Sequence, residues 1–124
     1  YGKQDYAALT AFVEEAAGEL GLTVEVFQSN HEGVLVDKIQ EALGRFDGIV
    51  LNPAAYTHTS VAILDALKSV GVPTVEVHLT DISKREEFRK TSVTKDACDH
   101  QIYGHGLDGY IMAIDYILEK IQTK

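Results

Sequence analysis

The chain has 124 residues, 45% of them hydrophobic, which suits one compact domain with its own core. Its 19 acidic and 11 basic residues give a formal charge of -8, and no cluster of Lys and Arg offers a footprint for a nucleic-acid backbone. No apolar run approaches the roughly 20 residues of a membrane helix, and no signal-peptide pattern opens the chain. A single cysteine, Cys98, cannot form an internal disulfide, so we expect a soluble, cytoplasmic protein.

Apolar spacing predicts helices and strands in alternation. A first amphipathic helix should run between Asp5, a candidate cap, and Gly21, a candidate stop. The alternating, β-branched residues 23–27 predict a strand, and the polar loop Q-S-N-H-E-G follows it. A second helix should carry the apolar positions from Val34 to Leu43 and close at Gly44. The chain thus begins with a helix where an α/β protein usually has a strand.

The remaining elements complete an α/β pattern. We expect strands at 48–51, 74–78 and 101–103, and helices at 60–70 and 108–121. The helix at 60–70 is apolar almost all round, so we expect another subunit to cover it. Strands and helices alternate without repeats or low-complexity linkers, which predicts a single doubly wound domain with a parallel sheet.

The stretch N-P-A-A-Y-T-H-T-S at 52–60 joins a strand to a helix through a loop rich in polar groups. In open parallel sheets, ligands bind at the carboxyl ends of the strands, in such loops. The polar residues of this loop therefore predict one wall of a small-molecule site. They are Asn52, Thr57, His58, Thr59 and Ser60. The alternative is a solvated loop whose hydroxyls cap the next helix.

Glu76 and His78 lie two residues apart on one strand, so both side chains should point to the same face at its carboxyl end. A histidine there can transfer a proton near neutral pH, and a neighbouring carboxylate can fix its tautomer. A purely structural hydrogen-bonded pair is the alternative. Asp65, among apolar neighbours in the helix at 60–70, should need a partner from a ligand, an arginine or a second subunit.

Other patterns are less specific. Arg85 and Arg89 would share a helix face and could bind an anionic substrate, although a solvated charged face explains them as well. Gly104, Gly106 and Gly109 match G-x-G-x-x-G, but no second strand follows, so tight turns account for them better than a dinucleotide. The five histidines form no metal-binding pair by spacing, and Cys98 fits a small, half-buried cysteine better than a nucleophile.

Several stretches together resemble type II dehydroquinase, the 3-dehydroquinate dehydratase of the shikimate pathway. They match in the family's order along the whole chain and are F-Q-S-N-H-E-G at 27–33, L-N-P-A-A-Y-T-H-T-S at 51–60, V-E-V-H-L at 75–79, R-E-E-F-R at 85–89 and G-x-x-G-Y at 106–110. The resemblance implies a flavodoxin-like, three-layer α/β/α catalytic domain over residues 1–124 and a dodecamer built from trimers. It also implies anti elimination of water from 3-dehydroquinate through an enolate, without metal or cofactor.

The resemblance also implies the roles of individual residues. Tyr1 resembles the lid-loop tyrosine that removes the proton beside the ketone, His78 the general acid that protonates the departing hydroxyl, and Glu76 the residue that orients this histidine. Asn52, His58 and Arg89 resemble residues that bind the polar groups of the substrate. Leu79 and Thr80 resemble the pair that holds its carboxylate, and Asp65 resembles a residue that reaches the site of a neighbouring subunit.

One part of the family pattern falls before the start of the sequence. A tyrosine with a free pKa near about 10 works as a base at neutral pH only when a cation lowers that value. Family members supply an arginine upstream of the tyrosine and an asparagine after the first strand, and both would precede Tyr1. Because the chain begins with Tyr1 rather than Met, we expect a longer gene product that includes this strand and the rest of the lid loop.

Three other hypotheses about function compete with that of a cofactor-independent lyase. A flavodoxin-like module would bind flavin or phosphate, a metal-dependent hydrolase would use the histidines, and an inactive homologue would only assemble into the oligomer.

Overall fold

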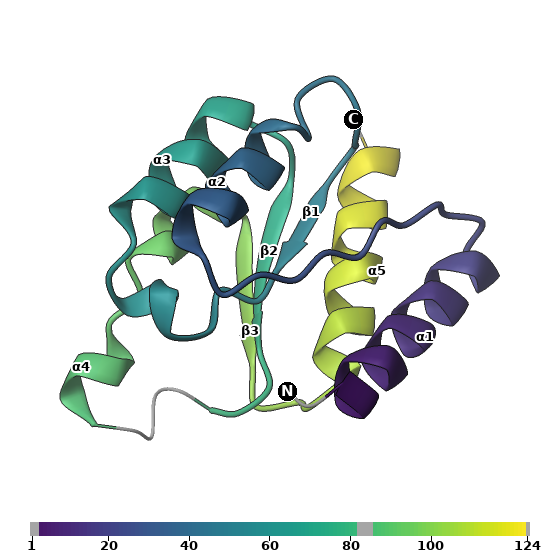
Figure 1. The fold of residues 1–124 in the computed structure, drawn as a ribbon. Coiled ribbons are helices and arrows are strands. Elements are labelled where there is room, and N and C mark those ends of the chain that lie inside the picture. Colours follow the sequence, from purple (N-terminus) through teal and green to yellow (C-terminus); the bar gives the residue numbers. More distant parts are fainter. Residues whose placement is uncertain (1–2, 82–85, 124) are drawn as a thin grey trace.

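The computed structural model, which describes residues 3–81 and 86–123, has a parallel sheet between two layers of helices (Figure 1). The strands are β1 (Ile49–Leu51), β2 (Thr74–His78) and β3 (His100–Tyr103), in the order β1-β2-β3. Glu76 in the middle of β2 is in register with Leu51 of β1 and with Gln101 of β3. All three strands run in the same direction, so their carboxyl ends meet at one edge, and the three predicted strands at 48–51, 74–78 and 101–103 are confirmed.

Helices cover both faces of the sheet, as the doubly wound prediction requires (Figure 1). On one face, α1 (Lys3–Glu19) packs beside α5 (Asp108–Gln122), and their apolar side chains meet Val75 and Val77 of β2. On the other face, α2 (Glu32–Gln40) packs against α3 (Val61–Val70), whose Ile63 and Leu67 are fully buried. Within the described residues, no helix combines the length and the apolarity that crossing a membrane needs.

The helix ends differ in part from those expected: α2 ends at Gln40, short of the predicted stop at Gly44, and two further expectations need correction. Ser60 caps α3, since its Oγ accepts a hydrogen bond from Ile63 N at 3.0 Å, and Gly71 ends this helix in the left-handed conformation (φ 70°). Asp5 does not cap α1, because it lies inside the first turn, where its negative charge complements the helix dipole. The α3 helix is not apolar all round: Ile63, Ala66, Leu67 and Val70 are buried, whereas Val61, Ala62, Asp65, Lys68 and Ser69 are exposed.

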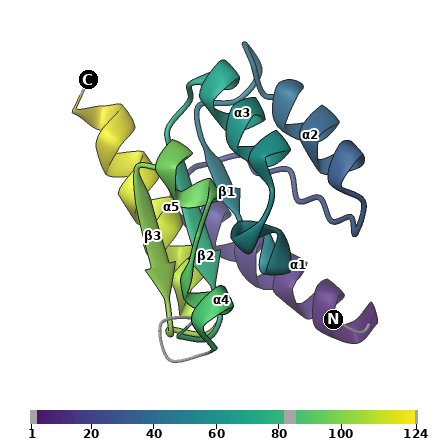
Figure 2. The same cartoon turned by 90° about the vertical axis from the view of Figure 1, so that its left-hand side faces the viewer.

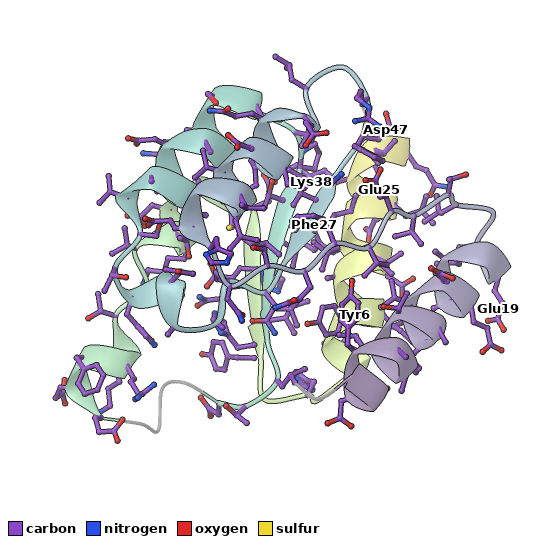
Figure 3. All side chains as sticks on the ribbon, in the orientation of Figure 1. Tyr6, Glu19, Glu25, Phe27, Lys38 and Asp47 are labelled. Carbon is purple, nitrogen blue, oxygen red and sulfur yellow. The ribbon has the colours of Figure 1, made fainter. Side chains whose placement is uncertain are left out.

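The predicted strand at 23–27 is wrong. Its alternation is real, since Val24 and Val26 are partly buried against the cluster under α1 and α5. On the outward side, Glu25 forms an ion pair with Lys38 of α2, whose ammonium also lies 5.2 Å from the centre of the Phe27 ring (Figure 3). The segment adds no strand to the sheet of β1, β2 and β3. Alternating burial needs only a surface to pack on, but a strand needs a neighbouring backbone for its hydrogen bonds.

The glycines before and inside α5 fit tight turns and close packing. Gly104 and Gly106 have φ angles of 84° and 56°, a region that suits glycine and shapes the turn between β3 and α5. Gly109 faces the sheet, where an added Cβ would lie 3.1 Å from Val77 Cγ1. The absent side chain lets α5 lie close to β2, and the next residue, Tyr110, is thereby brought to the edge where the strands end.

Candidate active site

Segments from four parts of the chain meet at the carboxyl edge of the sheet (Figure 2). The short 3-10 helix η1 (Ala54–His58) follows β1, and Leu79 and Thr80 follow β2. The single-turn helix α4 (Glu87–Lys90) lies at the same edge in both Figure 1 and Figure 2. The fourth segment is the turn from β3 into α5. Parallel strand direction alone places these polar loops together.

Glu76 is the central charged group, a carboxylate that is completely buried (0% exposed). Its Oε2 accepts hydrogen bonds from Thr57 Oγ1 at 2.7 Å and Gln101 Nε2 at 2.6 Å, and Ser92 Oγ lies 3.2 Å from it. Thr94 Oγ1 donates to the other oxygen, Oε1. We call these four residues the Glu76 cradle. Both oxygens of the buried charge have donors, which burial of a carboxylate requires.

The cradle determines the charge of Glu76. Burial alone would raise the pKa of this carboxyl, because it penalises the charged form. Hydrogen bonds from His78 and from Thr94, Thr57 and Gln101 outweigh that effect and lower the pKa of Glu76 to about 2, from an ordinary value of 4.5. Glu76 is therefore ionised at neutral pH.

His78 lies beside Glu76, as their spacing on β2 predicts. The His78 Nε2 atom is 2.6 Å from Glu76 Oε2, and the ring is 6% exposed. Main-chain hydrogen bonds fix the chain that follows, since Gly104 N donates to His78 O at 3.3 Å and Gly106 N donates to Leu79 O at 3.0 Å. A mostly buried imidazole that an anion holds at the carboxyl edge of the sheet can donate a proton to a bound molecule.

Asn52 has its amide fixed on both sides. Its Oδ1 accepts from Ala54 N at 3.0 Å, which closes a tight turn, and its Nδ2 donates to Tyr110 OH at 3.0 Å. Ala54 takes a left-handed conformation (φ 51°) within that turn. Nδ2 carries a second hydrogen, so Asn52 can still donate one hydrogen bond to a ligand.

His58 and Arg89 both lie against the Phe88 ring. The His58 ring meets the Phe88 ring edge-on with centroids 6.5 Å apart, and the Arg89 guanidinium lies 5.0 Å from the centre of the same ring. His58 Nδ1 donates to Thr91 O at 2.7 Å, because a carbonyl can only accept. Arg89 Nε bonds Glu86 at 2.8 Å. The structure thus links these two predicted binding residues through η1 and α4.

The structure gives less information on the other predicted site residues. Leu79 and Thr80 follow His78 without a break, and Leu79 is partly buried. Asp65 is exposed on α3, and no hydrogen bond or ion pair joins it to the other described residues at this edge. Tyr1 and Arg85 lie outside the described residues, which leaves the helix face that Arg85 and Arg89 should share untested.

Cys98 does not have the environment of a nucleophile. Its Sγ donates to Thr94 O at 3.4 Å, and burial together with the negative charges of Glu76 and Asp99 raises the pKa of the thiol to about 12. The half-buried cysteine of the sequence interpretation is confirmed. In residues 3–81 and 86–123, no three His, Cys, Asp or Glu side chains gather as a metal ion would need.

Sequence reasoning missed several polar partners. Ser92, Thr94 and Gln101 bind Glu76, and Tyr110 binds Asn52, yet none was a candidate. Gln101 had a usable signal, because it is a polar residue at the start of the strand predicted at 101–103. Ser92 and Thr94 had none, since they reach Glu76 from an irregular segment around the short 3-10 helix Thr94–Ala97.

Comparisons with known proteins show the family of this chain. The family model described as Dehydroquinase class II matches residues 1–118. The chain belongs to the type II dehydroquinase family. A 3-dehydroquinate dehydratase from Lachnospira eligens is 51% identical over the whole chain and 86% of its own length. The one from Thermotoga maritima is 48% identical over 98% of this chain and 83% of its own length. This type II dehydroquinase is therefore an enzyme.

Solved structures of the family share the fold. The type II dehydroquinase from Butyrivibrio crossotus superposes with a TM-score of 0.89 at 51% identity, over 91% of this chain and 79% of its own. A 3-dehydroquinate dehydratase-like protein from Bifidobacterium longum gives a TM-score of 0.78 at 31% identity, over 98% of this chain and 92% of its own. The flavodoxin-like α/β fold expected from the resemblance is confirmed.

Proposed function

We propose that this type II dehydroquinase removes water from 3-dehydroquinate by anti elimination through an enolate, giving 3-dehydroshikimate, with His78 as the general acid. Family membership assigns the 3-dehydroquinate dehydratase reaction and its place in the shikimate pathway. The observation that carries the residue assignment is the 2.6 Å contact between His78 Nε2 and the buried, ionised Glu76. It supplies a proton donor with a fixed orientation at the edge where such sheets bind ligands.

The elimination needs a base as well as an acid. The proton beside a ketone is weakly acidic, so a strong base must remove it while nearby groups stabilise the enolate. We assign this base to Tyr1, on the family pattern. The departing hydroxyl then takes a proton from His78, which prevents hydroxide from being the leaving group. Neither transfer involves a cofactor in this proposal.

The remaining predicted residues would bind the substrate. Asn52 offers one N–H, and His58 offers Nε2, because its Nδ1 is already bonded to Thr91 O. Arg89 would supply a positive charge, although it must then share its guanidinium with Glu86. Leu79 and Thr80, directly after His78, would hold the substrate carboxylate through their backbone N–H groups.

We also propose the family's assembly for this chain, a cytoplasmic dodecamer built from trimers. Val61 is 56% exposed at the start of α3, and Asp65 one turn further on is exposed too. An apolar side chain beside an acidic one on an open helix face suits a subunit contact in which Asp65 reaches a neighbouring site. Light scattering of the full-length protein should give twelve times the subunit mass, and a monomer would refute the assembly.

The catalytic assignment is tested by following conjugated-enone absorbance when the full-length protein meets 3-dehydroquinate. His78→Ala should lower kcat by roughly 100-fold or more, the loss expected when a general acid is removed. His100→Ala is the matched control, because His100 lies at the opposite end of the sheet and stacks on Tyr116 with ring centroids 5.0 Å apart. The control should retain the parent kcat.

The outcomes separate the competing functions. Near-normal kcat in His78→Ala would refute the acid role. Turnover that a chelator abolishes would favour a metal-dependent hydrolase. No turnover by the full-length parent protein would favour an inactive homologue or a binding module.

A further inference from the structure

The hydrogen atoms of the Glu76 cradle can be placed by counting donors. Each hydroxyl has one hydrogen to donate. Thr57 donates to Glu76 Oε2 and Thr94 donates to Oε1, so neither has a hydrogen for the other, although their oxygens are 3.0 Å apart. Ser92 Oγ lies 2.6 Å from Thr57 Oγ1 and 3.2 Å from Glu76 Oε2, so its hydrogen belongs to the shorter contact, with Thr57 as acceptor.

The hydrogens of Gln101 and of the Lys95 backbone can be placed in the same manner. Gln101 Nε2 has two hydrogens, one directed at Glu76 Oε2 at 2.6 Å and the other at Ser92 Oγ at 3.2 Å. The backbone N–H of Lys95 also donates to Ser92 Oγ at 3.2 Å. Thr57, Thr94 and Gln101 thus donate to Glu76 directly, Ser92 acts through Thr57, and Glu76 has no hydrogen to donate in return.

This arrangement assigns the proton on His78. Since Glu76 only accepts, the contact at 2.6 Å requires that His78 Nε2 donate. Nε2 therefore keeps its hydrogen in both the neutral and the charged ring. Nδ1 is the nitrogen that gains and loses a proton.

We propose that the Glu76 cradle makes Nδ1 of His78 the proton-donating atom of the elimination, with Thr94 and Gln101 as positioning residues. This proposal rests on the proposed role of His78 as general acid. In the step, the C–O bond to the departing hydroxyl breaks and its electron pair leaves with the oxygen. The Nδ1 proton of the imidazolium joins that oxygen to form water. A neutral ring remains, whose Nε2–H still donates a hydrogen bond to Glu76.

The cradle prevents two competing events. Without donors on both oxygens, the Glu76 carboxylate could rotate and turn the imidazole away from the substrate. A less stabilised carboxylate would also take up a proton more readily and could no longer accept from Nε2. A misplacement of about 1 Å in a catalytic group is enough to slow a reaction by roughly 100-fold.

The test is a set of matched variants of the full-length protein, assayed with 3-dehydroquinate. Thr94→Val keeps the shape of the side chain but removes its hydroxyl, whereas Thr94→Ser keeps the hydroxyl. Thr10→Val is the control for the same chemical change, because Thr10 Oγ1 is buried in α1 with no hydrogen-bond partner among the described residues. Gln101→Met removes the amide donor at similar length, and it decides the matter if Thr94→Val fails to fold.

Thr94→Val and Gln101→Met should lower kcat by roughly 10- to 100-fold with KM changed less than about twofold, since the lost interaction acts in the transition state. Thr94→Ser should restore most of kcat, and Thr10→Val should match the parent protein. The parent kcat in folded Gln101→Met, a rise in KM alone, or an equal loss in Thr94→Ser would overturn the proposal. Activity in His78→Ala would instead refute the proposed function, so the two failures are distinguishable.

Discussion

Two carboxylates at different positions along β2 are stabilised by different means. Glu76, in the middle of the strand, is buried and is held by the neutral side chains of its cradle and by His78. Asp99, beside the amino end, is exposed, accepts from Thr74 N at 2.7 Å and forms an ion pair with Lys120 of α5. In both residues burial raises the carboxyl pKa and hydrogen bonds lower it by more, for Asp99 chiefly the bond from Lys120.

The two carboxylates differ in whether water and dissolved ions can replace their partners. Dissolved salt screens an exposed pair such as Asp99 with Lys120, so water and ions can substitute for either partner. Nothing from solution reaches Glu76, which makes its donors indispensable. The buried carboxylate in the middle of β2 is therefore stabilised by oriented dipoles, and the exposed one beside its amino end by a charge pair.

The largest effect should come from replacing the buried carboxylate. Glu76→Gln keeps the size of the side chain but puts an amide donor among hydroxyl and amide donors, and it removes the acceptor of His78. We expect kcat to fall by roughly 100-fold and the free energy of unfolding to fall by about 3 kcal/mol. Enone absorbance and urea unfolding at one protein concentration measure the two losses, and unchanged stability would mean that the cradle does not stabilise the charge.

The pH dependence of stability should separate Glu76 from other groups. Because the pKa of Glu76 in the folded protein is lowered from 4.5 to about 2, its contribution is complete above pH 4.5 and is lost as pH falls toward 2. Each pKa unit corresponds to about 1.4 kcal/mol, so the contribution is roughly 3 kcal/mol.

The measurement is urea unfolding of the parent and of Glu76→Gln at several pH values from 7 to about 2.5. The stability difference between them should shrink as pH falls through this window. A difference that is constant with pH would contradict the lowered pKa.

The smallest effect should come from the exposed pair. Lys120→Ala leaves the Asp99 bonds to the Thr74 backbone in place, so we expect a smaller loss of stability than in Glu76→Gln and an unchanged kcat. The loss should nearly vanish in about 1 M salt, where the Debye length is only about 3 Å. A loss that persists in high salt would show that the packing of the Lys120 side chain matters more than its charge.

Sequence reasoning succeeded where the chemistry is local. The alternation along β2 was enough to place Glu76 beside His78, and the apolar run at 60–70 was enough to place α3. It failed where the answer depends on distant backbone. Residues 23–27 alternate like a strand but have no partner in the sheet, and Thr94 reaches Glu76 only because of how the chain turns between α4 and β3.

Because its members come from three places in the sequence, the Glu76 cradle gives the protein a late step in folding. Thr57, Ser92, Thr94 and Gln101 span 45 residues of sequence, and Gln101 meets Glu76 only once β3 has paired with β2. Contacts of such long range form slowly, after helices that need only neighbouring residues. During refolding, helical circular dichroism should therefore return before turnover does, and catalysis would report the closing of the sheet.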